Sequence, residues 1–198
     1  MLANGTFDIP PGKGAVITTY LEMTTKPPAR PAVLPEGVTI ASLPEPDFDS
    51  YRALFLRVGG MPSLWASRLE LSEPELMAIL RHRDVHNYTL MQDDTPQAML
   101  ELDFSLTGAC EITFFGVAPH LTGTTAARCL MTEAITQAWA RPIAKLHLHT
   151  CTHDHPAALA FYQRSGFEPV RQSVDVFDDP RISGVLPRDA VPRVPIFE

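Results

Sequence analysis

Apolar side chains recur at helical spacing in four segments of the sequence. Residues 48–58 carry one apolar face and are followed by a glycine pair, which predicts a helix that ends there. Residues 72–81 begin with the capping-box pattern Ser-Glu-Pro-Glu, which predicts a second helix. An apolar stripe over residues 125–139 and a short segment over 156–165, closed by Gly166, predict two more.

Segments rich in β-branched and aromatic residues predict strands between these helices. Residues 88–91 and 98–104 flank an Asp-Asp-Thr-Pro turn and predict a hairpin. Successive strands followed by strand–helix–strand units are typical of a mixed α/β or α+β sheet. The other expected strands are residues 15–21, 38–41, 110–117, 145–152 and 171–177.

Length and charge limit the classes of protein that fit this sequence. A chain of 198 residues, 45% of them hydrophobic, can bury a sizeable core as one domain. The 16 Lys and Arg residues against 23 Asp and Glu give a net charge of −7. This charge argues against a duplex nucleic-acid partner and favours a neutral or cationic small molecule.

Membrane spans, signal peptides and paired cysteines are sequence features that indicate the cellular compartment. No apolar run has the length of a membrane span, so no membrane association is expected. The opening residues show no basic region followed by an apolar stretch, as a signal peptide would. The three cysteines are not spaced as pairs, which argues against a disulfide framework. We therefore expect a cytoplasmic protein.

Prolines and charges are unevenly distributed along the chain. Residues 1–36 and 179–198 hold ten of the 19 prolines and no net charge, whereas residues 37–178 carry the whole net charge of −7. We therefore expect a Pro-rich extension with one strand over 1–36, one domain over 37–178, and a Pro-rich tail over 179–198. The two ends would brace the fold or form a homodimer contact.

The junction after the strand that ends at Val117 predicts an anion site. A short loop leads into the sequence Thr-Gly-Thr-Thr-Ala-Ala over residues 122–127, which opens a helix. Small residues at a helix N-terminus allow a pyrophosphate to approach free backbone N–H groups. An ordinary capped helix is the alternative. Further on, residues 155–167 form a helix with an aromatic pair, which spacing alone would place in the core.

Together, in this order, the two junctions resemble the coenzyme motifs of the GNAT superfamily of acyl-CoA-dependent N-acyltransferases. The resemblance covers about residues 37–178 and implies a mixed, mostly antiparallel central sheet flanked by helices, with an extra N-terminal strand. Thr122 replaces the usual Arg or Gln of the first motif, Thr125 replaces a glycine, and His155 replaces the Asn of the second motif. The matching positions are Val117, Pro119, Gly123 and Ala127 in the first motif, and Ala158, Tyr162, Gly166 and Phe167 in the second.

The resemblance implies acetyl-CoA as co-substrate, no metal, and roles for individual residues. Tyr162 would protonate the leaving thiolate, and Glu111 would be the base that accepts the proton of the amine. Six strand residues separate Glu111 from Val117, roughly 20 Å, which is comparable to the pantetheine arm. A backbone N–H near residues 115–117 would polarise the thioester carbonyl. The implied coenzyme-binding residues are Phe115, Val117, Thr122, Gly123, Thr124, Thr125, Ala126, Ala127, His155 and Tyr162.

Further residues are candidates for contact with the acceptor. Glu101 and Asp103 share one face of the preceding strand and are reserve bases. Solvated carboxylates without a catalytic role are the alternative for both and for Glu111. Trp65 lies in the segment that commonly caps the acceptor site in this family, where it would enclose an amine. A core position is equally compatible with the sequence.

A cluster of histidines supports a competing hypothesis. His147, His149, His153 and His155 alternate along the chain with Cys151 among them, and on one strand they would all face one side. Imidazole and thiolate are zinc ligands, but residues of a single strand cannot surround an ion without a bend. Packing, or contact of His149 or His155 with substrate or coenzyme, is therefore favoured over a metal site.

The sequence thus predicts an N-acetyltransferase that acts on an amine of a small molecule or peptide. The replacements at Thr122 and Thr125 keep open a non-catalytic acyl-CoA-binding protein of the same fold. The histidine cluster keeps open a zinc-dependent hydrolase.

Overall fold

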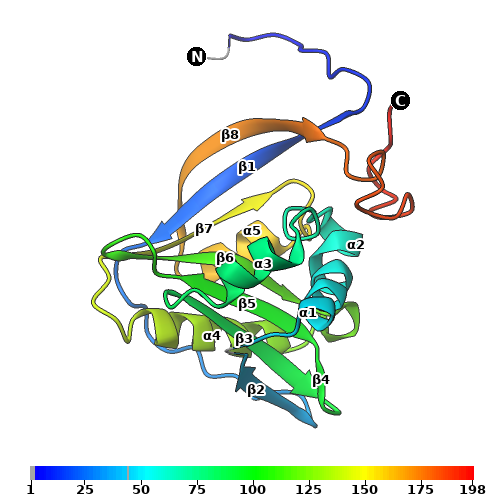
Figure 1. Cartoon of the computed structure of the whole chain (residues 1–198). Coiled ribbons are helices and arrows are strands. Elements are labelled where there is room, and N and C mark those ends of the chain that lie inside the picture. The colour runs from blue at the N-terminus through cyan, green and yellow to red at the C-terminus, as the bar shows by residue number, and fades with distance from the viewer. Residues whose placement is uncertain (1–2, 44) are drawn as a thin grey trace.

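The computed structural model describes residues 3–43 and 45–198, so residues 1–2 of the predicted extension and residue 44 of the predicted domain lie outside it. Its central feature is one sheet of eight strands in the order β2-β3-β5-β6-β7-β1-β8, with β4 paired to β3 (Figure 1). The strands are β1 (Lys13–Met23), β2 (Val38–Ser42), β3 (Val85–Gln92), β4 (Thr95–Pro96), β5 (Ala98–Asp103), β6 (Ala109–Val117), β7 (Lys145–Cys151) and β8 (Glu168–Asp178). The helices are α1 (Phe48–Phe55), the π-helical turn η1 (Leu56–Gly60), α2 (Met61–Ser63), α3 (Glu73–Leu80), the 3-10 turn η2 (Pro119–Leu121), α4 (Ala126–Ala138) and α5 (Ala158–Arg164).

Helices cover both faces of the sheet. On one face, α4 and α5 enclose a core that includes Leu102 and Leu130, which are fully buried. On the other face, α1 packs against β5 and α3 against β3, and Phe55 and Leu76 are buried in the core between them. The predicted mixed, mostly antiparallel sheet flanked by helices is thereby confirmed. Within the described residues, no helix has the length and apolar character needed to cross a membrane.

The two parallel strands of the sheet separate soon after they meet. β6 and β7 pair only from Ala109–Lys145 to Glu111–His147, although β6 continues to Val117 and β7 to Cys151. All other strand pairs are antiparallel. The divergence leaves one edge of β6 unpaired in the middle of the sheet, where a ligand can approach its backbone.

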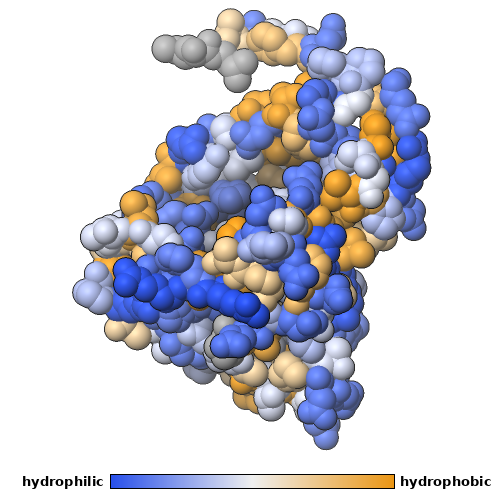
Figure 2. Space-filling model, viewed as in Figure 1, coloured by the Kyte–Doolittle hydropathy of each residue, from blue (hydrophilic) through white to orange (hydrophobic). Residues whose placement is uncertain are grey.

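The N-terminal strand lies inside the sheet. β1 pairs with β7 on one side and β8 on the other, antiparallel to both, so that β8 becomes an edge strand (Figure 1). β1 and β8 form a curved ribbon above the rest of the sheet, and Figure 2 shows apolar surface in this region. The two strands expose apolar side chains, among them Ile17, Val174 and Val176, each about half exposed. Residues 24–37 then lead from β1 to β2 at the opposite edge of the sheet.

The glycine pair after the first helix does not end it, contrary to the sequence prediction. The helix continues through η1 and α2 as far as Leu64, whose φ of 59° reverses the chain. Gly59 is required here for space, because a Cβ on it would lie 1.8 Å from Cε3 of Trp65. The glycine therefore allows the indole ring to pack directly on the helix backbone.

The C-terminal tail packs against α2. Leu64 forms a small core with Leu186 and Val191 of the tail, and the Val191 N–H donates to the Met61 carbonyl at 3.0 Å. Arg193 also donates to the carbonyls of Pro62 and His153. These contacts connect α2 to the turn after β7.

Candidate active site

A cavity of about 1390 Å³ occupies the space where β6 and β7 separate. It is larger than the roughly 300–1,000 Å³ of most small-molecule pockets, so it can hold a long cofactor together with a second molecule. Its walls come from β6, the start of α4, the turn between β7 and α5, and the segment after α2. The predicted site residues that line it are Trp65, Phe115, Val117, Thr122, Gly123, Thr124, Thr125, Ala127, His149, His155 and Tyr162.

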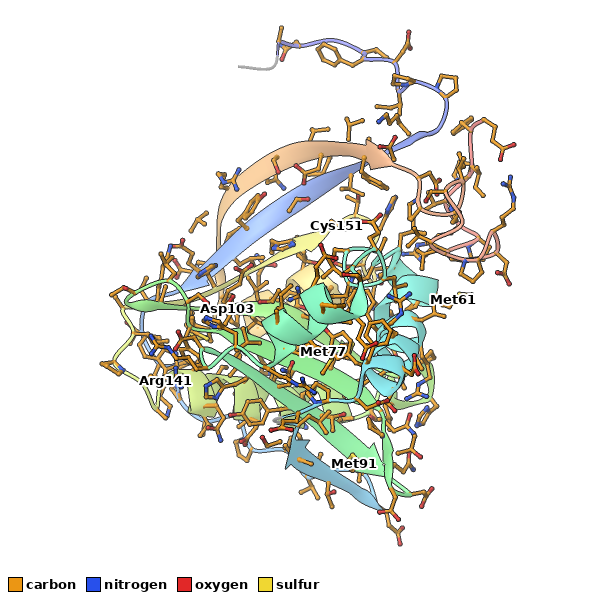
Figure 3. All side chains as sticks on the ribbon, viewed as in Figure 1. Met61, Met77, Met91, Asp103, Arg141 and Cys151 are labelled. Atoms are coloured by element: carbon orange, nitrogen blue, oxygen red, sulfur yellow. The ribbon has the colours of Figure 1, made fainter. Side chains whose placement is uncertain are left out.

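Four predicted site residues are not among the lining residues. Ala126 is fully buried in the core beneath α4. Glu101 is 1% exposed and lies behind Arg68, which does line the cavity. Asp103 accepts a hydrogen bond from the Ser105 N–H at 2.7 Å and lies at the far end of β5 from α2 (Figure 3). Glu111 is set back behind His149.

One end of the cavity is the loop from Thr122 to Thr125 and the first turn of α4. Gly123 has a φ of 80°, a left-handed conformation that favours glycine. The Thr124 hydroxyl accepts a hydrogen bond from the Ala126 N–H at 3.1 Å and donates to the Leu121 carbonyl at 2.7 Å. The loop is thereby fixed, and the first turn of α4 presents N–H groups that have no partner within the helix, as an anion site requires.

An aromatic wall borders the middle of the cavity. The ring of Phe115 stacks on that of Phe161 at 5.6 Å and meets that of Tyr162 edge-on at 6.1 Å. Tyr162 is 8% exposed, and burial, with a smaller contribution from the Asp154 carboxylate, raises the pKa of its hydroxyl well above the ordinary 10.0. The phenol therefore stays protonated and holds a proton at the cavity wall.

His149 and Glu111 form a pair beside the separation of the strands. Nδ1 of His149 lies 3.7 Å from Oε1 of Glu111, and the Tyr20 ring packs against the imidazole at 5.9 Å. The nearby Glu111 carboxylate raises the pKa of His149, and the same imidazole lowers the pKa of Glu111. Because His149 lines the cavity and Glu111 does not, the imidazole is the group that a ligand would meet first.

Trp65 is held rigidly on the opposite wall. Its Nε1–H donates to Oδ1 of Asp154 at 3.2 Å, and its ring packs against those of Phe55 and Phe114 at 5.6 and 5.2 Å. Oδ2 of Asp154 in turn accepts hydrogen bonds from the Thr150 hydroxyl at 2.7 Å and the Cys151 N–H at 2.9 Å. Figure 3 shows Cys151 at the end of β7, below the β1–β8 ribbon.

Sequence reasoning missed the charged residues of the cavity other than the histidines. Asp154 carries no motif signal beyond its position in the turn after a strand. Arg68 was also missed; its Nη2 lies 2.5 Å from Oε1 of the buried Glu101, an ion pair between two elements that only the fold brings together. Arg30, Arg128 and Arg164 line the cavity from three separate segments.

The histidine cluster is divided among different partners. His153 is 8% exposed and meets the Phe177 ring edge-on at 5.9 Å, whereas Nδ1 of His155 accepts from the Ala157 N–H at 3.1 Å near the start of α5. Both follow the end of β7 at Cys151, whereas His149 lies within the strand. Among the described residues, no three His, Cys, Asp or Glu side chains are arranged to hold a metal ion.

Known proteins resemble this chain in fold and in part of its sequence. A sequence model of the acetyltransferase (GNAT) family matches residues 50–167. A GNAT-family protein from Novosphingobium aromaticivorans superposes with a TM-score of 0.57 at 21% identity, over 87% of this chain and 70% of that one. A GCN5-related N-acetyltransferase from Sphaerobacter thermophilus gives 0.62 at 16% identity, over 90% of this chain and 54% of that one.

An aminoglycoside acetyltransferase from an uncultured soil sample, in complex with trehalose, gives a TM-score of 0.54 at 13% identity, over 65% of this chain and 87% of that one. No curated protein matches the chain. These structural likenesses support the fold, and the family match spans more than half of the sequence and includes both predicted coenzyme motifs. The chain therefore belongs to the GNAT acetyltransferase family.

Proposed function

We propose that this protein transfers an acetyl group from acetyl-CoA to a primary amine by direct attack. The observation that carries the proposal is the single cavity that connects the loop Thr122–Thr125 with Tyr162 and His149. The coenzyme would place its phosphates at the loop and run its pantetheine arm along the free edge of β6. The acceptor would enter from the side of Trp65 and the β1–β8 ribbon.

In the proposed reaction, the amine nitrogen attacks the thioester carbonyl carbon and the carbon–sulfur bond then breaks. His149 accepts the proton of the amine, and Glu111 behind it stabilises the imidazolium that forms. Tyr162 gives its proton to the departing thiolate and recovers one from solvent after release of the products. Glu111 thus contributes to the base through His149, and each proton-transfer group would supply about 10²–10⁴-fold in rate.

Trp65 and Arg68 would form the acceptor pocket. The indole provides a flat apolar surface on which an amine substrate can rest, and the Asp154 carboxylate fixes its orientation. Glu101 would act indirectly, since its carboxylate holds Arg68 at the cavity wall. The acceptor would be an amine of a small molecule or peptide.

The test is Tyr162→Phe, which keeps the ring and its packing against Phe115 and removes only the hydroxyl. Acetyl transfer is measured over a panel of amines, and acetyl-CoA binding by calorimetry. We expect kcat to fall by about 10²-fold or more with the acetyl-CoA Kd unchanged. Full activity in the variant would contradict the role of Tyr162, and absence of CoA binding by the wild type at millimolar concentration would overturn the proposed function.

A non-catalytic acyl-CoA-binding protein is the second candidate, favoured by the replacements Thr122 and Thr125 in the coenzyme loop. It predicts tight CoA binding without turnover on any amine of the panel. Loss of the slow background hydrolysis of acetyl-CoA in Tyr162→Phe would decide for the enzyme.

A further inference from the structure

The cavity is positively charged although the chain as a whole is acidic. Its lining contains four arginines and one carboxylate, Asp154, in a protein with a net charge of −7. Arg68 is paired with Glu101. Within residues 3–43 and 45–198, Arg30, Arg128 and Arg164 take part in none of the ion pairs. Three uncompensated guanidinium groups on one cavity are the electrostatic arrangement of a site for an anion.

These three arginines lie at the same end of the cavity. Arg128 belongs to the first turn of α4, and Arg164 is the last residue of α5. Nη1 of Arg30 donates a hydrogen bond to the Arg164 carbonyl. Arg30 and Arg128 also line a second, smaller cavity between the N-terminal segment and α4. The cluster therefore combines the N-terminal segment, α4 and α5 beside the loop Thr122–Thr125.

The connector, residues 24–37 between β1 and β2, positions Arg30. The Thr125 hydroxyl donates to the Val33 carbonyl at 2.6 Å, which joins the connector to the coenzyme loop. Pro27 lies against Gly166, where a Cβ would come within 3.3 Å of the proline. Because β1 is held between β7 and β8, one end of the connector is anchored in the sheet (Figure 1).

We propose that Arg30, which the connector positions at the large cavity, binds a phosphate group of CoA together with Arg128 and Arg164. The proposal rests on the proposed function. It adds a coenzyme-binding residue that lies outside residues 50–167, the range of the family match. Thr122 stands where the family motif has Arg or Gln, and Arg30 supplies the missing cation from an earlier part of the chain. A guanidinium has five N–H donors, so the bond to the Arg164 carbonyl leaves others for a phosphate.

The alternative for Arg30 is a purely structural one, in which it caps the C-terminal end of α5. Arg30→Gln separates the two roles, because the glutamine amide keeps an N–H donor and loses the charge. Lys26→Gln is the matched control, since Lys26 lies in the same connector and lines the small cavity but not the large one. Arg30→Lys, which retains the charge, should keep most of the affinity for CoA.

The experiment measures the Kd values of CoA, 3′-dephospho-CoA and pantetheine by calorimetry for the wild type and these variants. We expect Arg30→Gln to weaken CoA binding by about ten- to hundredfold, with pantetheine and Lys26→Gln unaffected. A loss that disappears with 3′-dephospho-CoA assigns Arg30 to the 3′-phosphate, and one that persists assigns it to the pyrophosphate; both support the proposal. Unchanged CoA binding, or an equal loss for pantetheine, would overturn it, whereas a wild type that does not bind CoA would refute the proposed function instead.

Discussion

Arg181 connects the two ends of the C-terminal tail, and its replacement should lower the free energy of unfolding. The residue is 2% exposed, and its Nε and Nη2 donate to the two carboxylate oxygens of Asp179 at 2.9 and 2.6 Å. Its Nη1 donates to the carbonyls of Ala190 and Val194 at 3.1 and 2.8 Å. One side chain thus holds the beginning and the end of the tail together.

Arg181→Ala would leave the Asp179 carboxylate, 5% exposed, buried without its cation. Loss of one partner from a buried ion pair typically costs about 3–5 kcal/mol, so we expect a decrease of that size in the free energy of unfolding. Urea denaturation followed by circular dichroism measures it. Tryptophan fluorescence should also change, because the tail packs on Leu64 next to Trp65.

The stabilisation depends on pH with a definite sign. Hydrogen bonding to Arg181 lowers the pKa of Asp179 below its ordinary 3.8. The ionised carboxylate is therefore more favoured in the folded protein than in the unfolded chain. The contribution is complete above the unfolded pKa and is lost as the pH falls through the lowered value. The difference in stability between wild type and Arg181→Ala should therefore shrink in acid.

The control is the double variant Asp179→Leu with Arg181→Met. Replacement of a buried ion pair by apolar residues of similar volume is often neutral, so the double variant should regain the part of the lost stability that comes from the unpaired Asp179 carboxylate. The bonds to the Ala190 and Val194 carbonyls are missing from both variants. The reasoning is refuted if Arg181→Ala unfolds within about 0.5 kcal/mol of the wild type, a difference typical of plain surface substitutions. It is equally refuted if the double variant is no more stable than the single one.

Two further predictions concern the cavity walls. Gly59→Ala should destabilise the protein by about 1–3 kcal/mol and slow acetyl transfer, because the new Cβ would lie 1.8 Å from Cε3 of Trp65. Gly5→Ala is the control, since the nearest atom to its new Cβ would lie at 3.8 Å. An unchanged melting temperature in Gly59→Ala would count against the argument. Acetyl transfer should rise with pH through the pKa of His149, which the nearby Glu111 carboxylate raises above the ordinary 6.5. Glu111→Gln should move this rise to lower pH in a kcat/KM profile, and a profile that does not move would disprove the coupling of the two groups.

Local sequence patterns predicted the elements well where each pattern matches its packing. The capping box at Ser72 is present, with the Ser72 N–H donating to Glu75 at 2.9 Å. The helix end predicted at the glycine pair was wrong. Glycine often marks a helix end, whereas Gly59 leaves space for the Trp65 ring against the helix backbone. Such a contact arises from tertiary packing, which a local pattern does not contain.

The residues of the candidate site also differ in how far the local sequence predicts their positions. Residues fixed by motif spacing, such as Thr122 and Tyr162, do line the cavity. Ala126 does not, because the helical period turns it into the core. Arg30 could not be predicted from its surroundings in the sequence, since its position depends on β1 pairing with β7 and β8.

The charge of the cavity differs from the charge of the whole chain. The acidic surplus favours a neutral or cationic small molecule, which the proposed amine acceptor would be, whereas the cavity lining carries four arginines against one carboxylate. Net charge governs association at a distance, whereas a ligand inside a cavity responds to the few groups that face it. A positive cavity would stabilise the coenzyme phosphates and the thiolate that leaves. It would also lower the pKa of a bound ammonium group, and so favour the free amine that the proposed attack requires.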